Sequence, residues 1–322
     1  MNIYHNISEF NKIEHAVVTI GTFDGVHFGH QKIIQTVVER AKLANAESVI
    51  LTFFPHPRMI IDPENAALKM INTIDEKAQI LEKLGVDHLI ITPFTRDFSN
   101  LSPDQYIKQI LVDTIGTKEL IIGYDHRFGK DRKGGLKELI DGGEIYGFKV
   151  QEIAEQDIDD VAVSSTKIRT ALLNGDVKLA SHYLGYNFSL TGSVIKGDKI
   201  GRTIGFPTAN LFVEESYKLI PADGIYAVSL HLSKEDNLDS ISQTYIGMAY
   251  IGQRPTINGM TRNIEVNIFD FNQEVYGQRL TMEFHEFLRA DYKFPSLETM
   301  TEQLKLDKEN TISYFKNNPL SL

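Results

Sequence analysis

The segment from Val17 to His30, VVTIGTFDGVHFGH, places two histidines and three glycines where a buried strand turns into a helix. The apolar run from Ala16 to Ile20 predicts the strand, and apolar residues at helical spacing after His30 predict the helix. Gly21 and Gly25 permit a tight turn between the two elements. The segment therefore predicts a turn from a buried strand directly into a helix N-terminus.

Such a turn is suited to holding the phosphates of a nucleotide. His27 and His30 fall on one face of the first helical turn. Free backbone N–H groups and the helix dipole favour an anion there, and Gly29 lets a phosphate approach the backbone. A capping or surface pair is the ordinary interpretation of two isolated histidines. Neither GxxxxGK[ST] nor GxGxxG is present, so neither common phosphate-binding motif accounts for the segment.

The run TFDGVHFGH resembles the HxGH signature of the nucleotidyltransferase superfamily, in which a nucleophile attacks the α-phosphate of a nucleoside triphosphate and pyrophosphate leaves. The resemblance implies catalytic roles for His27 and His30. It also implies ATP or phosphate contacts from the residues of the turn, namely Gly21, Phe23, Asp24, Gly25, His27, Gly29 and His30.

A second candidate site lies in KGDKIGRTIGFPTAN, from Lys196 to Asn210, which has glycines four residues apart and Lys199 between the first two. Glycine spacing alone also fits a flexible hairpin loop. Thr208 and Asn210 offer neutral oxygens one residue apart, suited to a phosphate-bound Mg²⁺ that keeps several of its waters. The run resembles the PTAN motif of riboflavin kinases. That resemblance implies Mg²⁺ and nucleotide binding by Thr208 and Asn210, further phosphate contacts from Gly201 and Arg202, and a flavin contact from Phe206.

Further segments occur in the order of a riboflavin kinase: DGIYAV, GMAYIGQRPTI, IEVNIFDF and LRADYKFPS. Within IEVNIFDF, Glu265 matches the catalytic base of that family. The ribityl 5′-hydroxyl is a poor nucleophile, and a positioned carboxylate can take its proton as the γ-phosphate transfers. A solvent-facing strand glutamate is the alternative interpretation.

The last of these segments resembles a flap near the flavin. The resemblance implies flavin contacts from Arg289, Tyr292 and Phe294, and an aromatic side chain can stack on an isoalloxazine ring. Where the family often has glutamate this chain has Asp291, so the role of that carboxylate stays open.

A nucleotidyltransferase half followed by a riboflavin kinase half is the order found in prokaryotic-type bifunctional FAD synthetases, and the resemblance covers nearly the whole chain. It implies that the second domain makes FMN from riboflavin and ATP and that the first adenylylates FMN to FAD. His126 replaces an expected phenylalanine, which leaves the role of GYDHRFG open, and serines near residue 165 are also ordinary helix caps. Further residues implied by the resemblance are His56, Ser165, Thr166 and Arg169 at the phosphates, with Arg169 also in catalysis, and Asp125 near the nucleotide or flavin.

The first half of the chain predicts an α/β, Rossmann-like domain with a parallel sheet, because strand-like and helix-like segments alternate. Ser102, Pro103 and Gln105 predict the start of a helix that runs to about Ile115. Ligands bind at the carboxyl ends of such strands. FFPHPR and GYDHRFG follow predicted strands and are expected there together with the histidine turn. The predicted strands cover residues 16–20, 48–54, 88–91, 119–122 and 148–153.

The second half predicts an antiparallel sheet closed toward a barrel, since its strands follow one another without helical crossovers. A final helix over residues 296–315 is expected to pack across it. Two short helices ending at Gly185 place the boundary there, giving domains over residues 1–185 and 186–322. The predicted strands cover residues 188–195, 225–232, 244–251, 264–271 and 279–288.

Composition limits the class of protein. A chain of 322 residues accommodates two domains. With no cysteine it has no disulfides, thiolate nucleophiles or cysteine-ligated metal sites, and a net charge of -10 argues against a general nucleic-acid or membrane surface. The basic, glycine-rich run RFGKDRKGG is either a solvated loop or a clamp for triphosphate or pyrophosphate.

The N-terminus lacks the pattern of a signal peptide, and no apolar run approaches the length of a membrane span. We therefore expect a cytoplasmic enzyme, monomeric or weakly homo-oligomeric, with riboflavin, FMN and ATP as substrates and Mg²⁺ as cofactor. Two alternatives remain: another adenylyl- or cytidylyltransferase with an unrelated β domain, and a flavin-binding regulator without catalysis. PTAN and IEVNIFDF count against the first, and the intact HxGH, PTAN and Glu265 count against the second.

Overall fold

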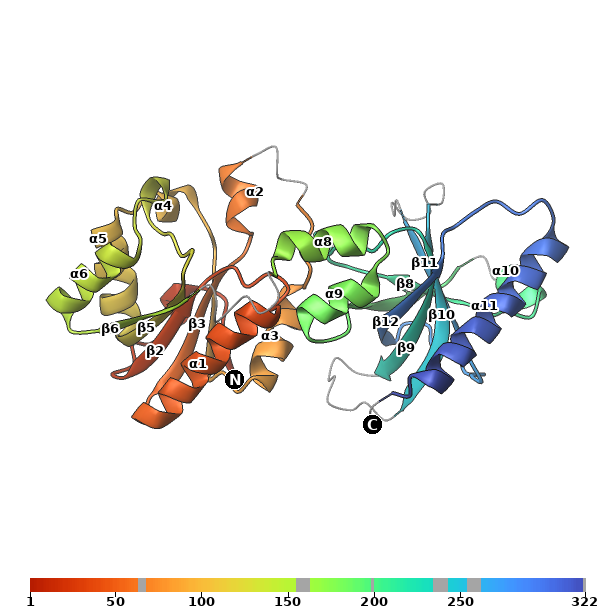
Figure 1. Ribbon diagram of the computed structural model, residues 1–322, viewed down its shortest axis with the longest axis horizontal. Coiled ribbons are helices and arrows are strands. Elements are labelled where there is room, and N and C mark those ends of the chain that lie inside the picture. Colours follow the sequence, from red (N-terminus) through yellow and green to blue (C-terminus); the bar gives the residue numbers. More distant parts are fainter. Residues whose placement is uncertain (63–67, 155–162, 198–199, 234–242, 254–261, 321–322) are drawn as a thin grey trace. The chain divides into compact units, whose positions relative to one another are not determined.

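The computed structural model describes every residue except 63–67, 155–162, 198–199, 234–242, 254–261 and 321–322 (Figure 1). Lys199 of the second candidate site therefore lies outside the described residues. Contacts divide the chain into two units, Met1–Ser165 and Thr166–Leu322, each of which has its own sheet. The two short helices that precede Gly185 are grouped with the second unit by contacts, and the boundary at Gly185 stays a prediction.

The first unit contains a parallel sheet in the order β1-β4-β3-β2-β5-β6, so the predicted α/β class is confirmed. The five predicted strands are all present, and β1 is an additional edge strand whose three residues were too few to give a sequence pattern. The strands are β1 (Asn2–Tyr4), β2 (Ala16–Ile20), β3 (Glu47–Phe53), β4 (His88–Thr92), β5 (Thr117–Gly123) and β6 (Lys149–Ile153).

Strand β2 lies in the middle of this sheet, and all five of its residues are buried. Alternate side chains point to opposite faces, so Ala16, Val18 and Ile20 enter one apolar cluster. Val17 enters the other. Because both faces of the sheet are covered, the sequence of this strand is a continuous apolar run. The bounds predicted from that run are therefore correct.

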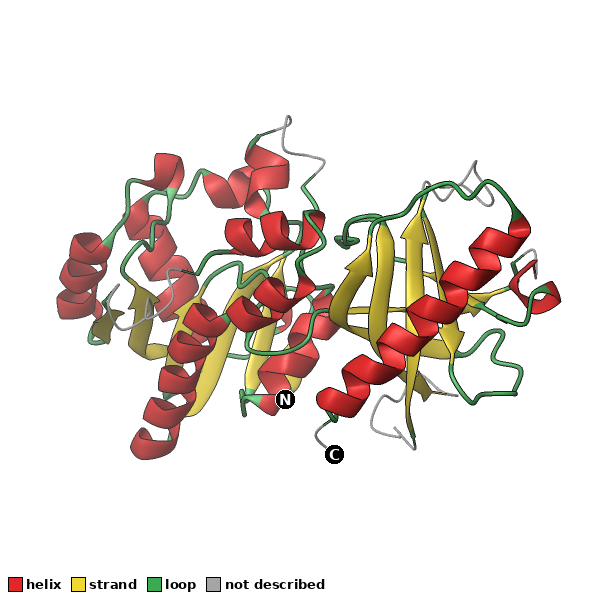
Figure 2. Cartoon of the chain, turned by 45° about the vertical axis from the view of Figure 1, so that its right-hand side comes forward, coloured by secondary structure: helices red, strands yellow, loops and turns green. Residues whose placement is uncertain are grey.

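Helices cover the two faces of the sheet (Figure 2). Helices α1 (Phe28–Ala44) and α3 (Ile74–Lys83) pack on the face that carries Val17. The other face is covered by α6 (Leu136–Tyr146) and by a π-helix, η3 (Tyr106–Ile115). Shorter helical segments complete the unit: η1 (Ile7–Glu9), α2 (Pro57–Ile61), α4 (Arg96–Ser99), α5 (Pro103–Gln105) and η4 (Lys130–Arg132).

The helix predicted from Ser102 to Ile115 is present, and Ser102 and Gln105 form its capping box as expected. From Tyr106 onward it is wound as a π-helix, which apolar spacing does not distinguish from an α-helix. The chain then leaves through Gly116, whose φ of 83° is a left-handed conformation that glycine adopts freely.

The strand order reverses direction at β2. The chain runs from β2 to β3 and β4 on one side, then returns to β5 on the other side of β2. Loops that leave the carboxyl ends of β2 and β5 therefore diverge, and ligands of parallel sheets bind at such a reversal. The histidine turn follows β2, His56 follows β3 and Asp125 follows β5, so all three lie at this edge.

The second unit contains a closed antiparallel barrel in the order β10-β11-β8-β7-β12-β9, as predicted. Strand β8 was missed, since it is short and was read as part of a glycine-rich loop, and the short helix α10 (Ile200–Thr203) precedes it. The strands are β7 (Ser189–Ile195), β8 (Ala209–Phe212), β9 (Gly224–Ser233), β10 (Thr244–Gly252), β11 (Asn263–Ile268) and β12 (Arg279–Arg289).

Three further helices belong to this half of the chain. The expected pair before Gly185 is α8 (Ser165–Leu173) and α9 (Val177–Leu184). The expected terminal helix is α11 (Leu297–Asn317), which crosses the outside of the barrel against β9, β10 and β12 (Figure 2).

Candidate active sites

The turn after β2 is strained and tightly built. Phe23 and Val26 have φ values of 44° and 35°, which side-chain-bearing residues rarely adopt, and Gly25 has a φ of 86°. A Cβ atom at Gly21 would lie 2.9 Å from the Phe23 ring, so this ring requires glycine at position 21. The Phe23 ring in turn meets His30 edge to face at 5.3 Å between centroids. Backbone strain of this kind persists where the surrounding structure enforces it, often at functional sites.

His27 and His30 are stacked at the start of α1, with ring centroids 3.6 Å apart and planes 17° apart. Burial lowers the pKa of His27 to about 4. Burial, His27 and Lys77 together place the pKa of His30 well below its usual value. Both imidazoles are therefore uncharged at neutral pH, which permits the stacking.

The cap geometry determines which nitrogen of His27 carries the proton. Its Nδ1 accepts a 3.4 Å hydrogen bond from the backbone N–H of His30. A neutral imidazole has one donor and one acceptor nitrogen, so Nε2 of His27 carries the hydrogen. His56 has the same arrangement at α2, where its Nδ1 accepts a 3.1 Å bond from Arg58 N–H. Two capping histidines thus each provide an N–H donor at this edge of the sheet.

Buried polar groups connect the turn to neighbouring segments through hydrogen bonds. The Asp24 carboxylate, 1% exposed, accepts a 2.9 Å bond from the backbone N–H of Ile71. The Asp24 carbonyl accepts a 2.8 Å bond from the Ser165 hydroxyl. Lys77 donates a 2.8 Å bond to the Thr22 carbonyl. The sequence did not single out Lys77, because one lysine in a polar-looking helical segment gives no signal of burial.

Ser165, whose hydroxyl donates to the Asp24 carbonyl, is the first residue of helix α8. Thr166 is exposed and Arg169 is partly buried on the same helix. Residues four apart share a helix face, so Arg169 lies on the face of Ser165. Their roles at the phosphates stay predictions.

The segment after β5 combines an exposed carboxylate with a partly buried histidine. Asp125 is exposed, whereas the His126 ring stacks on Phe128 with centroids 5.9 Å apart. Burial lowers the pKa of His126 to about 4. Its Nε2 has no hydrogen-bond partner within the described part of the chain.

The basic run from Arg127 to Gly135 forms a closed loop, since Phe128 and Gly134 exchange backbone hydrogen bonds of 3.1 and 3.0 Å. Its basic side chains are exposed: Arg127, Lys130, Arg132 and Lys133. The loop keeps a concentrated positive charge at the carboxyl end of β5, and its role as a phosphate clamp stays a prediction.

The second site forms where β8 pairs with β11 in the barrel. Asn210 lies directly opposite Glu265 in this pairing. Thr208 donates a 2.9 Å hydrogen bond to Glu265 Oε2, and Asn263 donates a 2.6 Å bond to Oε1. Each carboxylate oxygen is thus oriented by a neutral donor. The structure brings together Thr208, Asn210 and Glu265, which the sequence proposed as metal ligands and base. It adds Asn263, which the sequence did not suggest.

The glycines of this site have steric reasons. A Cβ atom at Gly197 would lie 2.2 Å from Nδ2 of Asn210. A Cβ atom at Gly201 would lie 2.2 Å from the Phe206 carbonyl oxygen. These glycines therefore allow a close approach of Gly197 to Asn210 and of Gly201 to Phe206. Arg202 is exposed on α10.

Thr208 and Asn210 fit a Mg²⁺ that is held mainly by phosphates and water. A hydroxyl that donates its hydrogen to Glu265 keeps its lone pairs available, and the side-chain amide has a carbonyl oxygen. Among the residues that the structure describes, no three His, Cys, Asp or Glu side chains form a group able to hold a metal ion.

The predicted flavin residues of the barrel lie in two clusters. Phe206 is buried with Ile225, Met248 and Phe269. Tyr292 and Phe294 lie near one another, at 4.5 Å between ring centroids.

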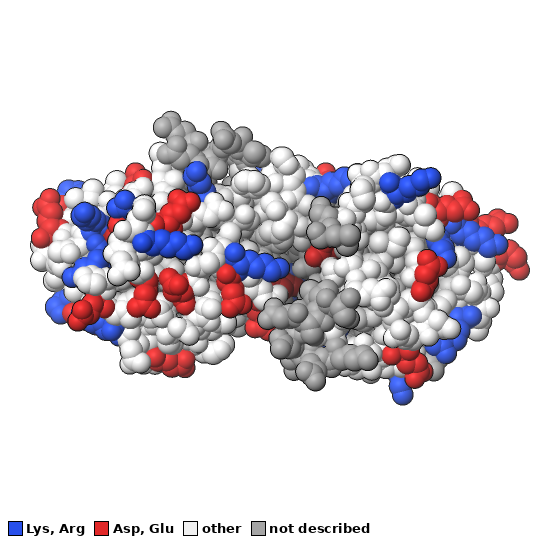
Figure 3. Space-filling model, turned by 90° about the horizontal axis from the view of Figure 1, so that it is seen from below, with Lys and Arg blue, Asp and Glu red and all other residues white. Residues whose placement is uncertain are grey.

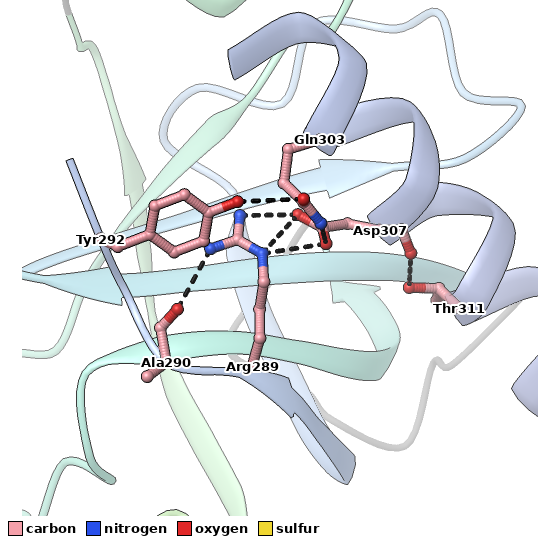
Figure 4. Close-up of polar contacts among 6 residues, drawn as sticks. All are labelled: Arg289, Ala290, Tyr292, Gln303, Asp307 and Thr311. Atoms are coloured by element: carbon pink, nitrogen blue, oxygen red, sulfur yellow. Dashed lines mark hydrogen bonds and ion pairs between the residues drawn. The ribbon is translucent and has the colours of Figure 1, made fainter. Parts of the chain in front are cut away.

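Arg289 organises the second cluster through helix α11 (Figure 4). Its guanidinium lies 4.8 Å from the Tyr292 ring and 5.6 Å from the Phe294 ring. It also binds both carboxylate oxygens of Asp307, at 2.8 to 3.1 Å. Gln303 bridges the two parts, because it donates to Asp307 and accepts from the Tyr292 hydroxyl. The sequence proposed Arg289 as a flavin contact, which stays a prediction, and gave no sign of Asp307, which is 1% exposed.

Asp291, whose role the sequence left open, accepts a 3.0 Å hydrogen bond from the Tyr250 hydroxyl. Tyr250 lies opposite Glu265 in the pairing of β10 with β11. The segment that carries Asp291 is thereby connected to the strand next to the candidate base.

On the face in Figure 3, lysine and arginine side chains lie among aspartate and glutamate side chains. In the described part of the chain, no helix has the length and apolar character needed to cross a membrane.

Comparisons with known proteins give two family matches. Residues 9–167 match the family model described as FAD synthetase, and residues 184–315 match the model described as riboflavin kinase. The chain is 38% identical over 307 residues to the bifunctional riboflavin kinase/FMN adenylyltransferase of Bacillus subtilis, covering 94% of this chain and 93% of that protein. The protein of the same description from Haemophilus influenzae is 36% identical over 318 residues, covering 98% and 100%.

A solved structure is also similar. The crystal structure described as a macrolide-efflux protein from Streptococcus pneumoniae has a TM-score of 0.85 and 31% identity, and the match covers 96% of this chain and 97% of that one. The two-unit fold is therefore shared with an experimentally determined structure.

Proposed function

The chain belongs to the family of bifunctional riboflavin kinase/FMN adenylyltransferases, which make FMN and FAD, and we propose which of its residues carry each reaction. In this proposal the barrel phosphorylates riboflavin at Glu265, and the first unit adenylylates FMN at the histidine turn. The observation that carries it is the meeting of Thr208, Asn210 and Glu265 at the pairing of β8 with β11.

In the kinase reaction, Glu265 takes the proton of the ribityl 5′-hydroxyl. The hydroxyl oxygen forms a bond to the γ-phosphorus of ATP, the bond to the bridging oxygen breaks, and ADP leaves. Hydrogen bonds from Thr208 and Asn263 support this role, because they hold the carboxylate in one orientation. Gly201 and Arg202 are the proposed neighbours of the ATP phosphates.

Thr208 and Asn210 are the proposed protein ligands of Mg²⁺. When bound there, the ion neutralises phosphate charge and aligns the γ-phosphate with the hydroxyl. The support is the chemistry of the two side chains and their position beside the base.

In the adenylyl transfer, a phosphate oxygen of FMN attacks the α-phosphorus of ATP and pyrophosphate leaves. A phosphomonoester carries a charge of about -1.5 to -2 at neutral pH, so this nucleophile needs no base. The site must instead neutralise charge and align the reactants. His27, His30 and His56 are the proposed phosphate contacts, and the fixed Nε2–H donors of His27 and His56 support this assignment.

Further residues complete this proposal. Gly29 admits a phosphate to the start of α1, and Gly21, Phe23, Asp24 and Gly25 shape the turn. Ser165, Thr166 and Arg169 are proposed as a second set of phosphate-binding residues, in which Arg169 provides positive charge. Asp125 is proposed to lie near the nucleotide or flavin.

In the barrel, Phe206, Tyr292 and Phe294 are the proposed contacts of the flavin ring. Arg289 is assigned a positioning role, since its guanidinium already binds Asp307 and stacks on Tyr292.

Riboflavin, FMN and ATP are the proposed partners, without nucleic acid or membrane, and the chain is proposed to act as a monomer or a weak homo-oligomer. Light scattering after size exclusion at micromolar concentration checks the last statement. A tight oligomer would contradict it.

Incubation with riboflavin, ATP and Mg²⁺, followed by chromatographic separation of the flavins, tests the activities together. Both FMN and FAD are expected. Removal of Mg²⁺ with a chelator is expected to stop the phosphorylation of riboflavin, and a reaction that continues at the same rate would contradict the metal assignment.

A further inference from the structure

Lys77 is a buried cation beneath the histidine turn that the two reactions described above do not use. It lies in α3, and 1% of its surface is exposed. Its Nζ donates a 2.8 Å hydrogen bond to the Thr22 carbonyl. Thr52, at the end of β3, donates a 3.2 Å bond to the same carbonyl. Two elements therefore hold one backbone group in the turn.

Lys77 is more than a hydrogen-bond donor. Burial lowers its pKa to about 8, and Asp24 opposes that effect, so the side chain carries a charge at neutral pH. Burying a charge is costly unless it is compensated. The charge also acts on His30, because Lys77 helps to lower the pKa of that imidazole. A methionine would fill a similar volume without this cost, so the charge calls for an explanation other than packing.

We propose that Lys77 is a positioning residue for adenylyl transfer, which holds the turn through the Thr22 carbonyl and provides one buried positive charge beneath the bound phosphates. A fixed charge in a water-poor site acts on phosphates more strongly than one in solvent. The inference rests on the proposed function of the histidine turn and adds a residue to it.

Lys77→Met removes both the donor and the charge. We expect the kcat/KM for FMN adenylylation to fall roughly 10- to 100-fold, the loss typical of displaced reactants. Phosphorylation of riboflavin by the same preparation is expected to stay unchanged. Lys83→Met on the same helix is the matched control, since Lys83 is exposed, and it should change neither reaction.

Two further variants separate the hydrogen bond from the charge. Thr52→Val removes the other bond to the Thr22 carbonyl and leaves every charge in place, so its loss should be smaller than that of Lys77→Met. Lys77→Arg keeps a permanent charge and should recover part of the activity.

The pH profile gives a signature that a purely structural lysine would lack. Among the described residues, Asp24 in the turn acts on Lys77 in α3, and Lys77 and His27 act on His30 at the start of α1. Lys77 loses its charge as pH rises through about 8, so the parent rate of adenylylation should decline in that range. A neutral amine still donates a hydrogen bond, whereas the arginine variant stays charged. The adenylylation rate of that variant should show no decline in this range. The pH profile of riboflavin phosphorylation by the same protein is the reference.

Adenylylation by Lys77→Met within about twofold of the parent would overturn the proposal, as would identical alkaline profiles for the parent and Lys77→Arg. If Lys77→Met does not fold, the alkaline profile of Lys77→Arg still decides. These outcomes differ from a failure of the proposed function, which would appear as normal adenylylation after replacement of both His27 and His30 with alanine.

Discussion

The hydroxyl of Thr208 donates a 2.9 Å hydrogen bond to Oε2 of Glu265 and so joins the PTAN segment to the strand of the proposed base. Thr208→Val keeps the shape but removes this bond and one proposed Mg²⁺ ligand. We expect riboflavin phosphorylation to fall about 10- to 100-fold, because both orientation and charge neutralisation are weakened. Thr208→Ser keeps the hydroxyl and is the control. Steady-state kinase assays check this, and equal rates for the valine and serine variants would contradict it.

The second prediction concerns Asp307, whose buried carboxylate holds Arg289 against Tyr292. Asp307→Asn should raise the KM for riboflavin more than it lowers kcat, since the ring-bearing segment loses its anchor. It should also destabilise the barrel by about 3 kcal/mol, the scale of a buried pair that loses one partner.

Glu309→Gln is the control for Asp307→Asn, because Glu309 is exposed on the same helix. Riboflavin titrations and urea unfolding measure the two effects. Unchanged KM together with unchanged stability would show that the cluster does not support the flavin side.

The third prediction uses His27 both as helix cap and as phosphate contact. Asp is a good N-cap, whereas Ala is not, with a difference of about 1 kcal/mol. His27→Asp should therefore unfold at a higher temperature than His27→Ala. It should nevertheless adenylylate FMN more slowly, because its negative charge repels the phosphates. Thermal unfolding and FAD formation from FMN test the pair, and faster adenylylation by the aspartate variant would contradict a phosphate contact at this position.

The fourth prediction concerns acid stability. Burial lowers the pKa of His126 to about 4, compared with 6.5 in an unfolded chain. Between these values the unfolded state binds more protons, so stability falls as pH drops from 6.5 toward 4. The slope for one histidine approaches 1.4 kcal/mol per pH unit in the middle of that window.

His126→Phe removes this contribution and also an imidazole nitrogen that lacks a described hydrogen-bond partner. Its stability should therefore decline less steeply on acidification than that of the parent, in which His27 and His30 act in the same direction. Urea unfolding at pH 7 and pH 5.5 gives both slopes. Equal slopes would mean that His126 is readily protonated in the folded protein.

Much of the fold could be predicted from the sequence, because a long apolar run indicates a strand that is buried on both faces. The bounds of β2 at Ala16 and Ile20 agree with the prediction for this reason. Strand β8 was missed, since only four residues pair there and the preceding glycines resemble a loop.

The residues of the candidate sites likewise fall into those that the sequence suggested and those that it did not. His27, Thr208, Asn210 and Glu265 were proposed from the sequence because their spacing and motifs stand out in it. Lys77 and Asp307 were not, since a charged residue in an amphipathic helix reads as solvent-exposed. Their roles depend on partners distant in the chain: the Thr22 carbonyl for the first and Arg289 for the second. A hydrogen bond to a backbone carbonyl leaves no pattern in the sequence.

The most direct test of the two-site account is a single variant, Glu265→Gln, supplied in turn with riboflavin and with FMN in the presence of ATP and Mg²⁺. The account predicts that FMN formation from riboflavin falls at least about 100-fold, the lower range for a general base. FAD formation from FMN should stay within about twofold of the parent rate. A parallel loss of both reactions in folded protein, or undiminished phosphorylation of riboflavin, would contradict it.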